Sequence, residues 1–126
     1  MKNYFATAIA EAARKRPELV VLACDYGFDT WTQFERDNPG RFRNCGIAEQ
    51  STIGLAAGLA LDGMLPVVYG ITPFVIERGF EQLKLDIVQQ NLKVIFGLYS
   101  DYKHDGPTHM ELGFFRLLNM LRGLGP

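Results

Sequence analysis

Cysteine is scarce in this chain. Only Cys24 and Cys45 occur among 126 residues, and each lies within an apolar stretch. Two separated thiols exclude a disulfide scaffold, and they lack the close cysteine pairing of structural zinc sites. We therefore expect thiols of a reduced compartment and no zinc site.

Long apolar runs and an excess of one charge are also missing. No stretch of 18 apolar residues occurs, and residues 1–5 lack the apolar core and cleavage site of a secretory signal. We expect no membrane segment, and the cytoplasm as the location. The 13 Lys and Arg nearly balance the 14 Asp and Glu, for a net charge of −1. This balance gives no indication of binding to nucleic acid or to an anionic membrane.

The composition that is present is that of one globular domain. Hydrophobic residues make up 48% of the chain and charged residues 21%, which argues against a disordered chain. A length of 126 residues suffices for one compact core and is too short for two ordinary domains. We predict a single domain over residues 1–126, without internal repeats.

Short apolar runs alternate with helical patterns along the sequence. The strand candidates are residues 19–24, 42–45, 65–69 and 92–98; the helix candidates are 3–15, 30–36, 49–61, a segment within 73–90, and 111–122. Continuously apolar strands indicate a sheet covered on both faces. The alternation predicts an α/β three-layer sandwich with a mainly parallel sheet. Pro66 should lie at the start of its strand, because proline cannot donate a ladder hydrogen bond.

Ligands of such sheets bind beyond the carboxyl ends of the strands. In this chain that edge should carry Asp25 and residues 46–49, 70–74 and 99–109. The residues at these positions are therefore the candidates for function.

Glu49 is the most informative of them. It follows the bend at Gly46 and begins a long helix whose residues 51–61 contain no ionisable group, so its partner must come from outside that helix. An acid in a first turn is common, because the dipole and the free amides favour it. Alternatively, Glu49 is held away from water and shares a proton with a ligand nitrogen. The second interpretation requires that the carboxylate neither point into bulk water nor pair with an arginine of its own chain.

The loop 99–109 contains both histidines of the chain, His104 and His109. Gly106-Pro107 predicts a tight turn that delivers His109 to the start of the last helix. A lone loop histidine is usually a solvated residue, but its position after a strand favours a functional role for His109.

Two phenylalanines of the third crossover have different predicted roles. Phe80 is spaced with Leu83 and Ile87 as a core residue of a helix. Phe74 falls in the loop 71–74, where an aromatic side chain is harder to bury and could stack on a flat ring.

Five segments, in register over most of the chain, resemble the pyrimidine-binding domain of transketolase-like thiamine diphosphate enzymes. This group includes 1-deoxyxylulose-5-phosphate synthase and split transketolases. The segments are residues 21–25, 42–50, 54–60, 73–74 with 80–82, and 105–109. The last of them reads Asp-Gly-Pro-Thr-His.

The resemblance implies a cofactor, thiamine diphosphate, and roles for four residues. Glu49 matches the glutamate that bonds N1' of the cofactor's aminopyrimidine and favours its imino tautomer. Phe74 matches the aromatic region that stacks on that ring, and His109 the histidine near the reacting carbon. Asp25 matches an acidic position near the cofactor. The implied reaction transfers a two-carbon unit to or from ketose phosphates or 2-oxo acids.

The departures from the family pattern imply a partner. No segment resembles the diphosphate-binding half of these enzymes, so Mg²⁺ and the diphosphate would be held by a partner subunit. The family's pyrimidine domain continues past the point where residues 122–126 end this chain, which predicts truncation at the C-terminus or a subunit piece. Arg78 could contact a substrate phosphate or form a helix-surface ion pair with Glu77 or Glu81.

Two other functions remain open. A non-catalytic dimerisation or regulatory module could retain the fold and pack a second copy or a related subunit against the small residues Gly54 and Gly58 of the Glu49 helix. A flavodoxin-like domain is disfavoured, because residues 25–29 contain no glycine-rich phosphate loop.

Overall fold

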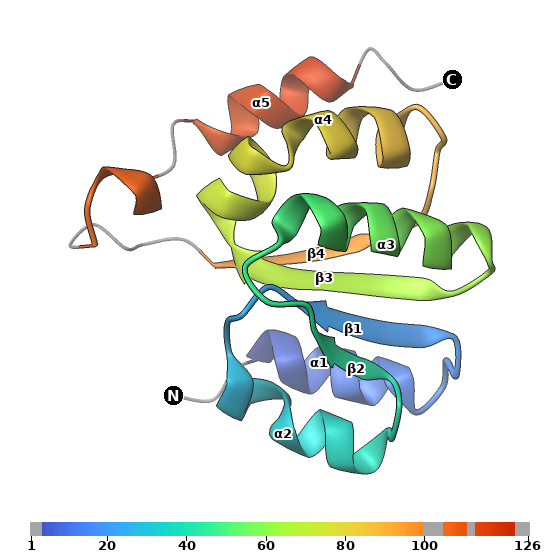
Figure 1. The fold of residues 1–126 in the computed structure, drawn as a ribbon. Coiled ribbons are helices and arrows are strands. Elements are labelled where there is room, and N and C mark those ends of the chain that lie inside the picture. The colour runs from blue at the N-terminus through green and yellow to red at the C-terminus, as the bar shows by residue number, and fades with distance from the viewer. Residues whose placement is uncertain (1–3, 100–104, 111–112, 123–126) are drawn as a thin grey trace.

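Four strands form one parallel sheet in the computed structural model, which describes residues 4–99, 105–110 and 113–122 (Figure 1). The strands are β1 (Leu19–Ala23), β2 (Phe42–Asn44), β3 (Leu65–Ile71) and β4 (Ile95–Tyr99), in the order β2-β1-β3-β4. All three pairings are parallel, with Val21 opposite both Phe42 and Val67. The predicted parallel sheet is confirmed, and Pro66 is the second residue of β3, as expected near its start.

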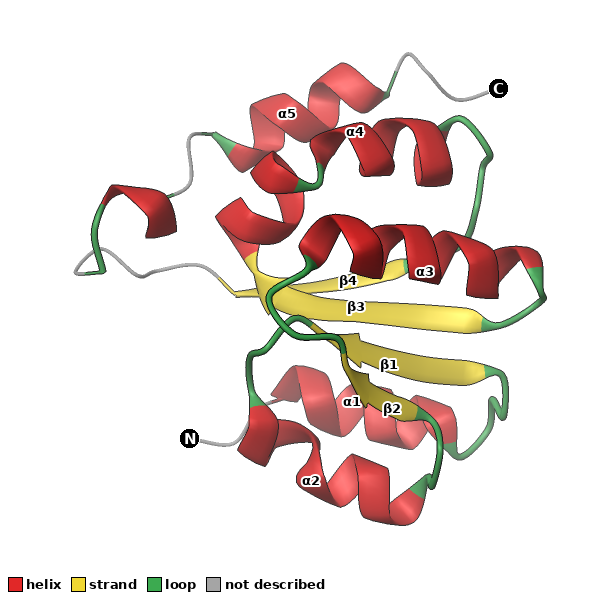
Figure 2. Ribbon diagram, in the orientation of Figure 1, coloured by secondary structure: helices red, strands yellow, loops and turns green. Residues whose placement is uncertain are grey.

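Helices cover both faces of this sheet and make three layers (Figure 2). On one face lie α1 (Tyr4–Ala13) and α2 (Phe28–Asp37). On the other lie α3 (Glu49–Leu61), α5 (Phe114–Leu121) and the helical segment around α4. All five residues of β1 are buried, because this strand is covered on both sides. The α/β three-layer sandwich is thereby confirmed.

The layer formed by α1 and α2 is held to the sheet by aromatic side chains. Trp31 of α2 is fully buried. Its ring centroid lies 5.1 Å from that of Tyr69 and 5.8 Å from that of Phe34, both edge-on, and Phe42 is stacked on it at 6.4 Å. One side chain therefore joins α2 to two strands.

The connection from β3 to β4 is a helical segment in three parts. These are η1 (Phe74–Arg78) and η2 (Leu83–Val88), both with π-helical hydrogen bonding, and α4 (Phe80–Gln82) between them. A Cβ on Gly79 would lie 2.3 Å from the Ile53 side chain and 2.6 Å from the Val75 carbonyl oxygen, so only glycine fits where η1 meets α3. Phe74 was expected in a loop. That expectation is wrong, because η1 begins with it immediately after Pro73.

The boundaries of three other elements also differ from prediction. Gly27 has φ 76°, which lets α2 begin at Phe28. Asn91 has φ 52°, and β4 begins at Ile95 rather than three residues earlier. The last helix begins at Phe114, after Gly113 with φ 88°. Within the described ranges no helix has both the length and the apolarity needed to cross a bilayer.

Candidate functional site

The chain reaches the predicted site through a bend between β2 and α3. The Asn44 side-chain oxygen accepts hydrogen bonds from the backbone N–H of Gly46 (3.0 Å) and of Asp25 (3.1 Å). Gly46 has φ 74°, a conformation that glycine adopts without strain. One asparagine therefore ties the end of β1 to the bend, which directs the chain into α3 at Glu49.

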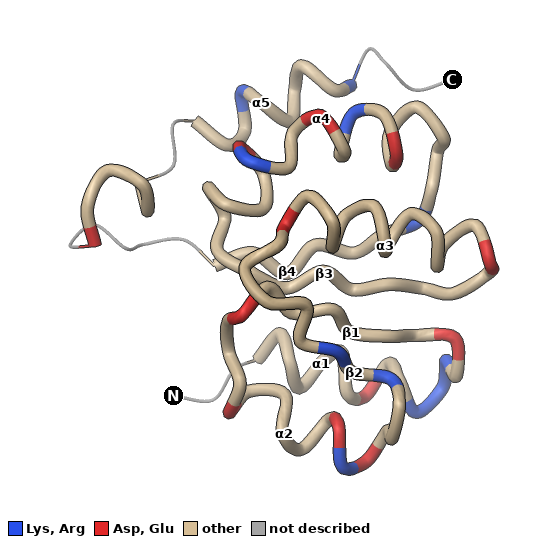
Figure 3. The backbone as a smooth tube through the Cα atoms, in the orientation of Figure 1, with Lys and Arg blue, Asp and Glu red and all other residues tan. Residues whose placement is uncertain are grey.

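Glu49 is the first residue of α3, and only 3% of its surface is exposed. The rest of the helix carries no charge as far as Asp62, which follows its last residue (Figure 3). Burial of this carboxylate is what the ligand-binding interpretation predicted. A buried carboxylate needs a donor, because an unpaired charge away from water is strongly unfavourable.

That donor is Arg78, 29 positions along the same chain. Its Nη1 lies 2.8 Å from Glu49 Oε2, and 44% of the arginine side chain remains exposed. The requirement that Glu49 pair with no arginine of its own chain is therefore not met. Arg78 also has a partner that neither of its predicted roles included. The physical reason is that η1 brings a long cation to the same sheet edge as the start of α3.

Arg78 further connects Glu49 to the two predicted ring residues. Its guanidinium carbon Cζ lies 4.5 Å from the centroid of the Phe74 ring, a cation–π distance. The His109 ring meets Phe74 edge-on, with centroids 4.8 Å apart and an interplanar angle of 71°. Three residues predicted from separate segments thus form one continuous group with Arg78, in the order Glu49–Arg78–Phe74–His109.

Asp25 lies at the end of β1 and contacts Asn44. It is exposed and has φ 47°, and its Oδ1 accepts a hydrogen bond of 3.2 Å from the Asn44 amide. In this structure its described contacts position the bend before α3 and do not join it to the Glu49 group. His104 falls outside the described residues.

Behind Glu49 lies a buried thiol. The pKa of Cys24 is raised from 9.0 to about 11, mainly by burial; a hydrogen bond with the Thr52 side chain opposes this rise, and the nearby charge of Glu49 adds to it. Cys24 is only 6% exposed and Cys45 is partly buried. Cys24 therefore stays a neutral thiol at physiological pH and adds no charge beside Glu49.

This thiol predicts a pH dependence of stability. The folded state binds the Cys24 proton more tightly than the unfolded state. The contribution of this thiol to the free energy of unfolding is therefore fully present below pH 9 and is lost as the pH rises through about 11. In denaturant unfolding, Cys24→Ala should show a smaller loss of stability over this interval than the wild type. Equal slopes for Cys24→Ala and the wild type would contradict the assignment.

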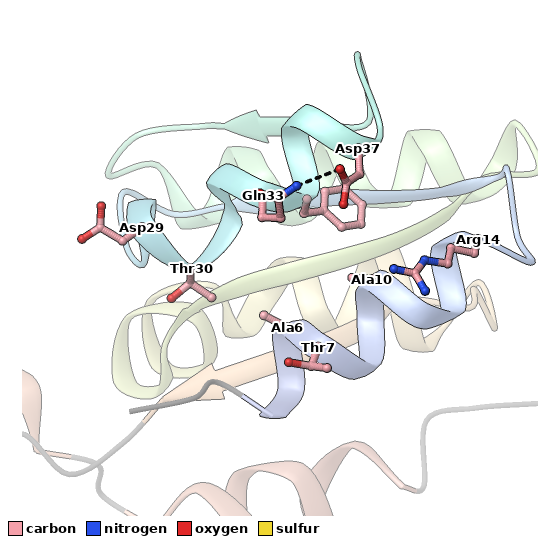
Figure 4. A pocket seen from close by; sticks show the side chains of 9 residues that line it. Ala6, Thr7, Ala10, Arg14, Asp29, Thr30, Gln33 and Asp37 are labelled. Carbon is pink, nitrogen blue, oxygen red and sulfur yellow. Dashed lines mark hydrogen bonds between the residues drawn. The ribbon is translucent and has the colours of Figure 1, made fainter.

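A hollow lies on the opposite side of the sheet from the Glu49 group, between α1 and α2 (Figure 4). It has a volume of about 430 Å³ and is lined by Arg14 and Asp29 among others. A hydrogen bond of 2.8 Å from Gln33 to Asp37 crosses part of its rim. None of the predicted site residues lines it. In the described part of the chain, no three His, Cys, Asp or Glu side chains are grouped so that they could hold a metal ion.

Known proteins resemble this chain over most of its length. The family described as "Transketolase, pyrimidine binding domain" matches residues 1–125. The chain belongs to this family. As a pyrimidine-binding domain it is 35% identical, over 97% of its length, to 1-deoxy-D-xylulose-5-phosphate synthase from Carboxydothermus hydrogenoformans. It is 33% identical, over 98% of its length, to a subunit of apulose-4-phosphate transketolase from Phocaeicola vulgatus.

A solved structure has the same fold. It is described as "Split gene transketolase, inactive beta4 tetramer", and it matches 90% of this pyrimidine-binding domain with a TM-score of 0.75 and 30% identity. The chain spans 20% of the synthase, 41% of the apulose-4-phosphate transketolase subunit and 37% of the solved chain. The relatives therefore contain parts that this sequence does not.

The residues at the site fit a flat ring that carries nitrogen. The Arg78 guanidinium is a planar group with N–H donors, and it already bonds Glu49 and lies against Phe74. The sequence analysis did not identify Arg78 as a member of this group. It also did not identify Asn44 as the residue that positions the bend before Glu49. The available signals were the uncharged helix, which required a cation from another segment, and an asparagine two residues before a glycine at a bend.

Proposed function

We propose that this chain supplies the pyrimidine-binding half of a thiamine diphosphate-dependent transketolase-type enzyme. The reaction would transfer a two-carbon unit to or from ketose phosphates or 2-oxo acids. The observation that carries the proposal is the Glu49 carboxylate, which is 3% exposed at the start of α3, in one group with the rings of Phe74 and His109. Membership of the transketolase pyrimidine-binding family supports it.

The chain's own residues would act as follows. Glu49 would share one proton with the ring nitrogen: the protonated acid donates its O–H to that nitrogen, and the carboxylate accepts the N–H once the proton has moved to the ring. Phe74 would offer its ring face, and His109, in edge contact with Phe74, would lie at the side of the site that the substrate enters. Thiamine diphosphate, when bound, supplies the carbanion-stabilising chemistry. Asp25 would position the bend before α3 and lie near the cofactor.

A partner must provide the rest of the site. We expect it to hold Mg²⁺ and the diphosphate, as the resemblance to the transketolase family implies. Relatives described as a transketolase subunit and as a split-gene transketolase support a partner subunit, with a homo-oligomer as the other arrangement.

The Glu49–Arg78 ion pair is the observation that opposes this function. A carboxylate bonded to its own chain's arginine cannot also bond a ring nitrogen through the same oxygen. The proposed function therefore requires Arg78 to leave. Its side chain is 44% exposed, so water can solvate the released guanidinium while the ring nitrogen replaces it as the donor to Glu49.

Reconstitution tests the proposal. The chain is mixed with a diphosphate-binding partner, sought among the products of genes next to its own, together with thiamine diphosphate and Mg²⁺. Calorimetry should detect tight cofactor binding only when both chains are present, and the mixture should then turn over a ketose phosphate or a 2-oxo acid. Absence of binding in the presence of every candidate partner would reject the proposal.

A second function is favoured by the same ion pair and by the described inactivity of the structural relative. In it, the chain is a non-catalytic module that retains the fold and assembles through the small-residue face of α3 at Gly54 and Gly58. Light scattering would then show a defined oligomer, while calorimetry would show no cofactor binding with or without a partner. Calorimetry in the presence of a partner thus separates the two functions, because only the enzymatic one predicts cofactor binding.

A further inference from the structure

Arg78 makes both of the contacts that the proposed function reserves for the aminopyrimidine. Its Nη1 donates to Glu49 Oε2 at 2.8 Å, and its Cζ lies 4.5 Å from the centroid of Phe74. A guanidinium is planar, delocalised and rich in N–H donors, as is a protonated aminopyrimidine. The same acceptor and the same ring face therefore serve either group, but not both together.

Resting on the proposed function, we propose that Arg78 is an internal stand-in for the cofactor ring. In the unloaded chain it occupies the pyrimidine position, and the ring enters only when this side chain leaves.

The exposed fractions of Glu49, Phe74 and Arg78 indicate which side chain moves when the ring binds. Glu49 is 3% exposed and fixed at the start of α3, and Phe74 is partly buried. Arg78 is the exposed member and ends η1 on a long, flexible side chain. Rotation of that side chain into solvent frees Oε2 and the ring face without moving the backbone of η1. Gly79, which is packed against Ile53 and the Val75 carbonyl, keeps that backbone in place.

Arg78 stabilises the chain in the state that precedes binding of the partner and the cofactor. If both the ligand and Arg78 were absent, Glu49 would be a buried charge without this donor, which is strongly destabilising. Arg78 supplies that donor until a ring nitrogen replaces it. The consequence is a lower apparent affinity for the ring, since only the fraction of molecules with Arg78 displaced can bind.

The test uses the cofactor's pyrimidine half, 4-amino-5-hydroxymethyl-2-methylpyrimidine, as the probe in calorimetry. The samples are the wild-type chain, Arg78→Ala, Arg78→Lys and the control Arg36→Ala, which removes an exposed arginine from α2 on the other face of the sheet. We expect Arg78→Ala to bind the probe about tenfold more tightly than the wild type, because the competing group is gone. Arg36→Ala should match the wild type, and Arg78→Lys should fall between.

Thermal unfolding gives a second measure that does not depend on activity. Arg78→Ala should unfold at a lower temperature than the wild type without the probe, and the difference should shrink when the probe is present. If Arg78→Ala does not fold, Arg78→Lys, which keeps the charge but not the planar donor, still reports the change in affinity. Thiamine diphosphate titrated into the assembly with a partner should give the same order of affinities.

Two results would overturn the inference, and they are distinguishable. If the probe binds in a manner abolished by Glu49→Gln, yet Arg78→Ala binds no more tightly than the wild type, the stand-in is wrong and the proposed function stands. If no form binds the probe or the cofactor, alone or with a partner, the proposed function fails and the stand-in fails with it.

Discussion

Replacing Glu49 by glutamine should lower the activity of the reconstituted assembly by about a hundred- to ten-thousandfold, the range that a positioned acid or base contributes. The amide has the size of the carboxylate and can still accept a hydrogen bond, but it cannot exchange a proton with a ring nitrogen. Glu49 is 3% exposed, so water cannot replace the missing proton acceptor. The measurement is turnover in the presence of the partner, thiamine diphosphate and Mg²⁺.

The matched control for this change is Glu35→Gln. It neutralises an exposed carboxylate of α2, on the opposite face of the sheet, and should leave activity unchanged. Circular dichroism and thermal unfolding should show that Glu49→Gln is folded, since the interpretation requires an intact structure. Equal turnover by Glu49→Gln and the wild type would remove Glu49 from the mechanism.

Trp31→Ala should destabilise the fold by about 3–5 kcal/mol, the usual cost of deleting a buried large aromatic. The side chain is fully buried and contacts Phe34, Phe42 and Tyr69, so its loss leaves a cavity between α2 and the sheet. The helices on the other face of the sheet belong to a separate buried cluster and cannot fill the cavity. Urea unfolding followed by far-ultraviolet circular dichroism measures the effect.

Trp31→Phe separates packing from hydrogen bonding in the same position. Trp31 Nε1 is buried and has no acceptor among the described residues, so its removal costs no hydrogen bond there. The phenylalanine variant should therefore lose clearly less stability than the alanine variant. A Trp31→Ala protein as stable as the wild type would contradict the packing described for this layer.

Much of the fold followed from local patterns. The apolar run at 19–24 predicted a strand buried on both faces, and β1 is buried at all five positions. The helix predicted over residues 49–61 has the same bounds as α3, and Gly63 just beyond it has φ 85°. Phe74 was misplaced, because the π-helical turns of η1 have no periodic signature that distinguishes their first residue from a loop.

The candidate site was predicted in pieces. Strand ends pointed to Glu49, Phe74 and His109 separately, and the structure places Phe74 against His109. Sequence patterns could not show that Arg78 lies between Glu49 and Phe74, because 29 positions separate it from Glu49 and no local rule couples them. That contact arises from the parallel order of the strands, which brings the segment after β3 beside the start of α3.

The sequence by itself determined the layered α/β architecture, the family and a single acid at the mouth of an uncharged helix. These are consequences of hydrophobic periodicity and of short motifs, both of which act over a few neighbouring residues. Only the tertiary structure decided which cation satisfies that acid. A buried carboxylate takes its partner from whatever chain segment the strand order places within hydrogen-bonding distance, and here that segment supplies Arg78.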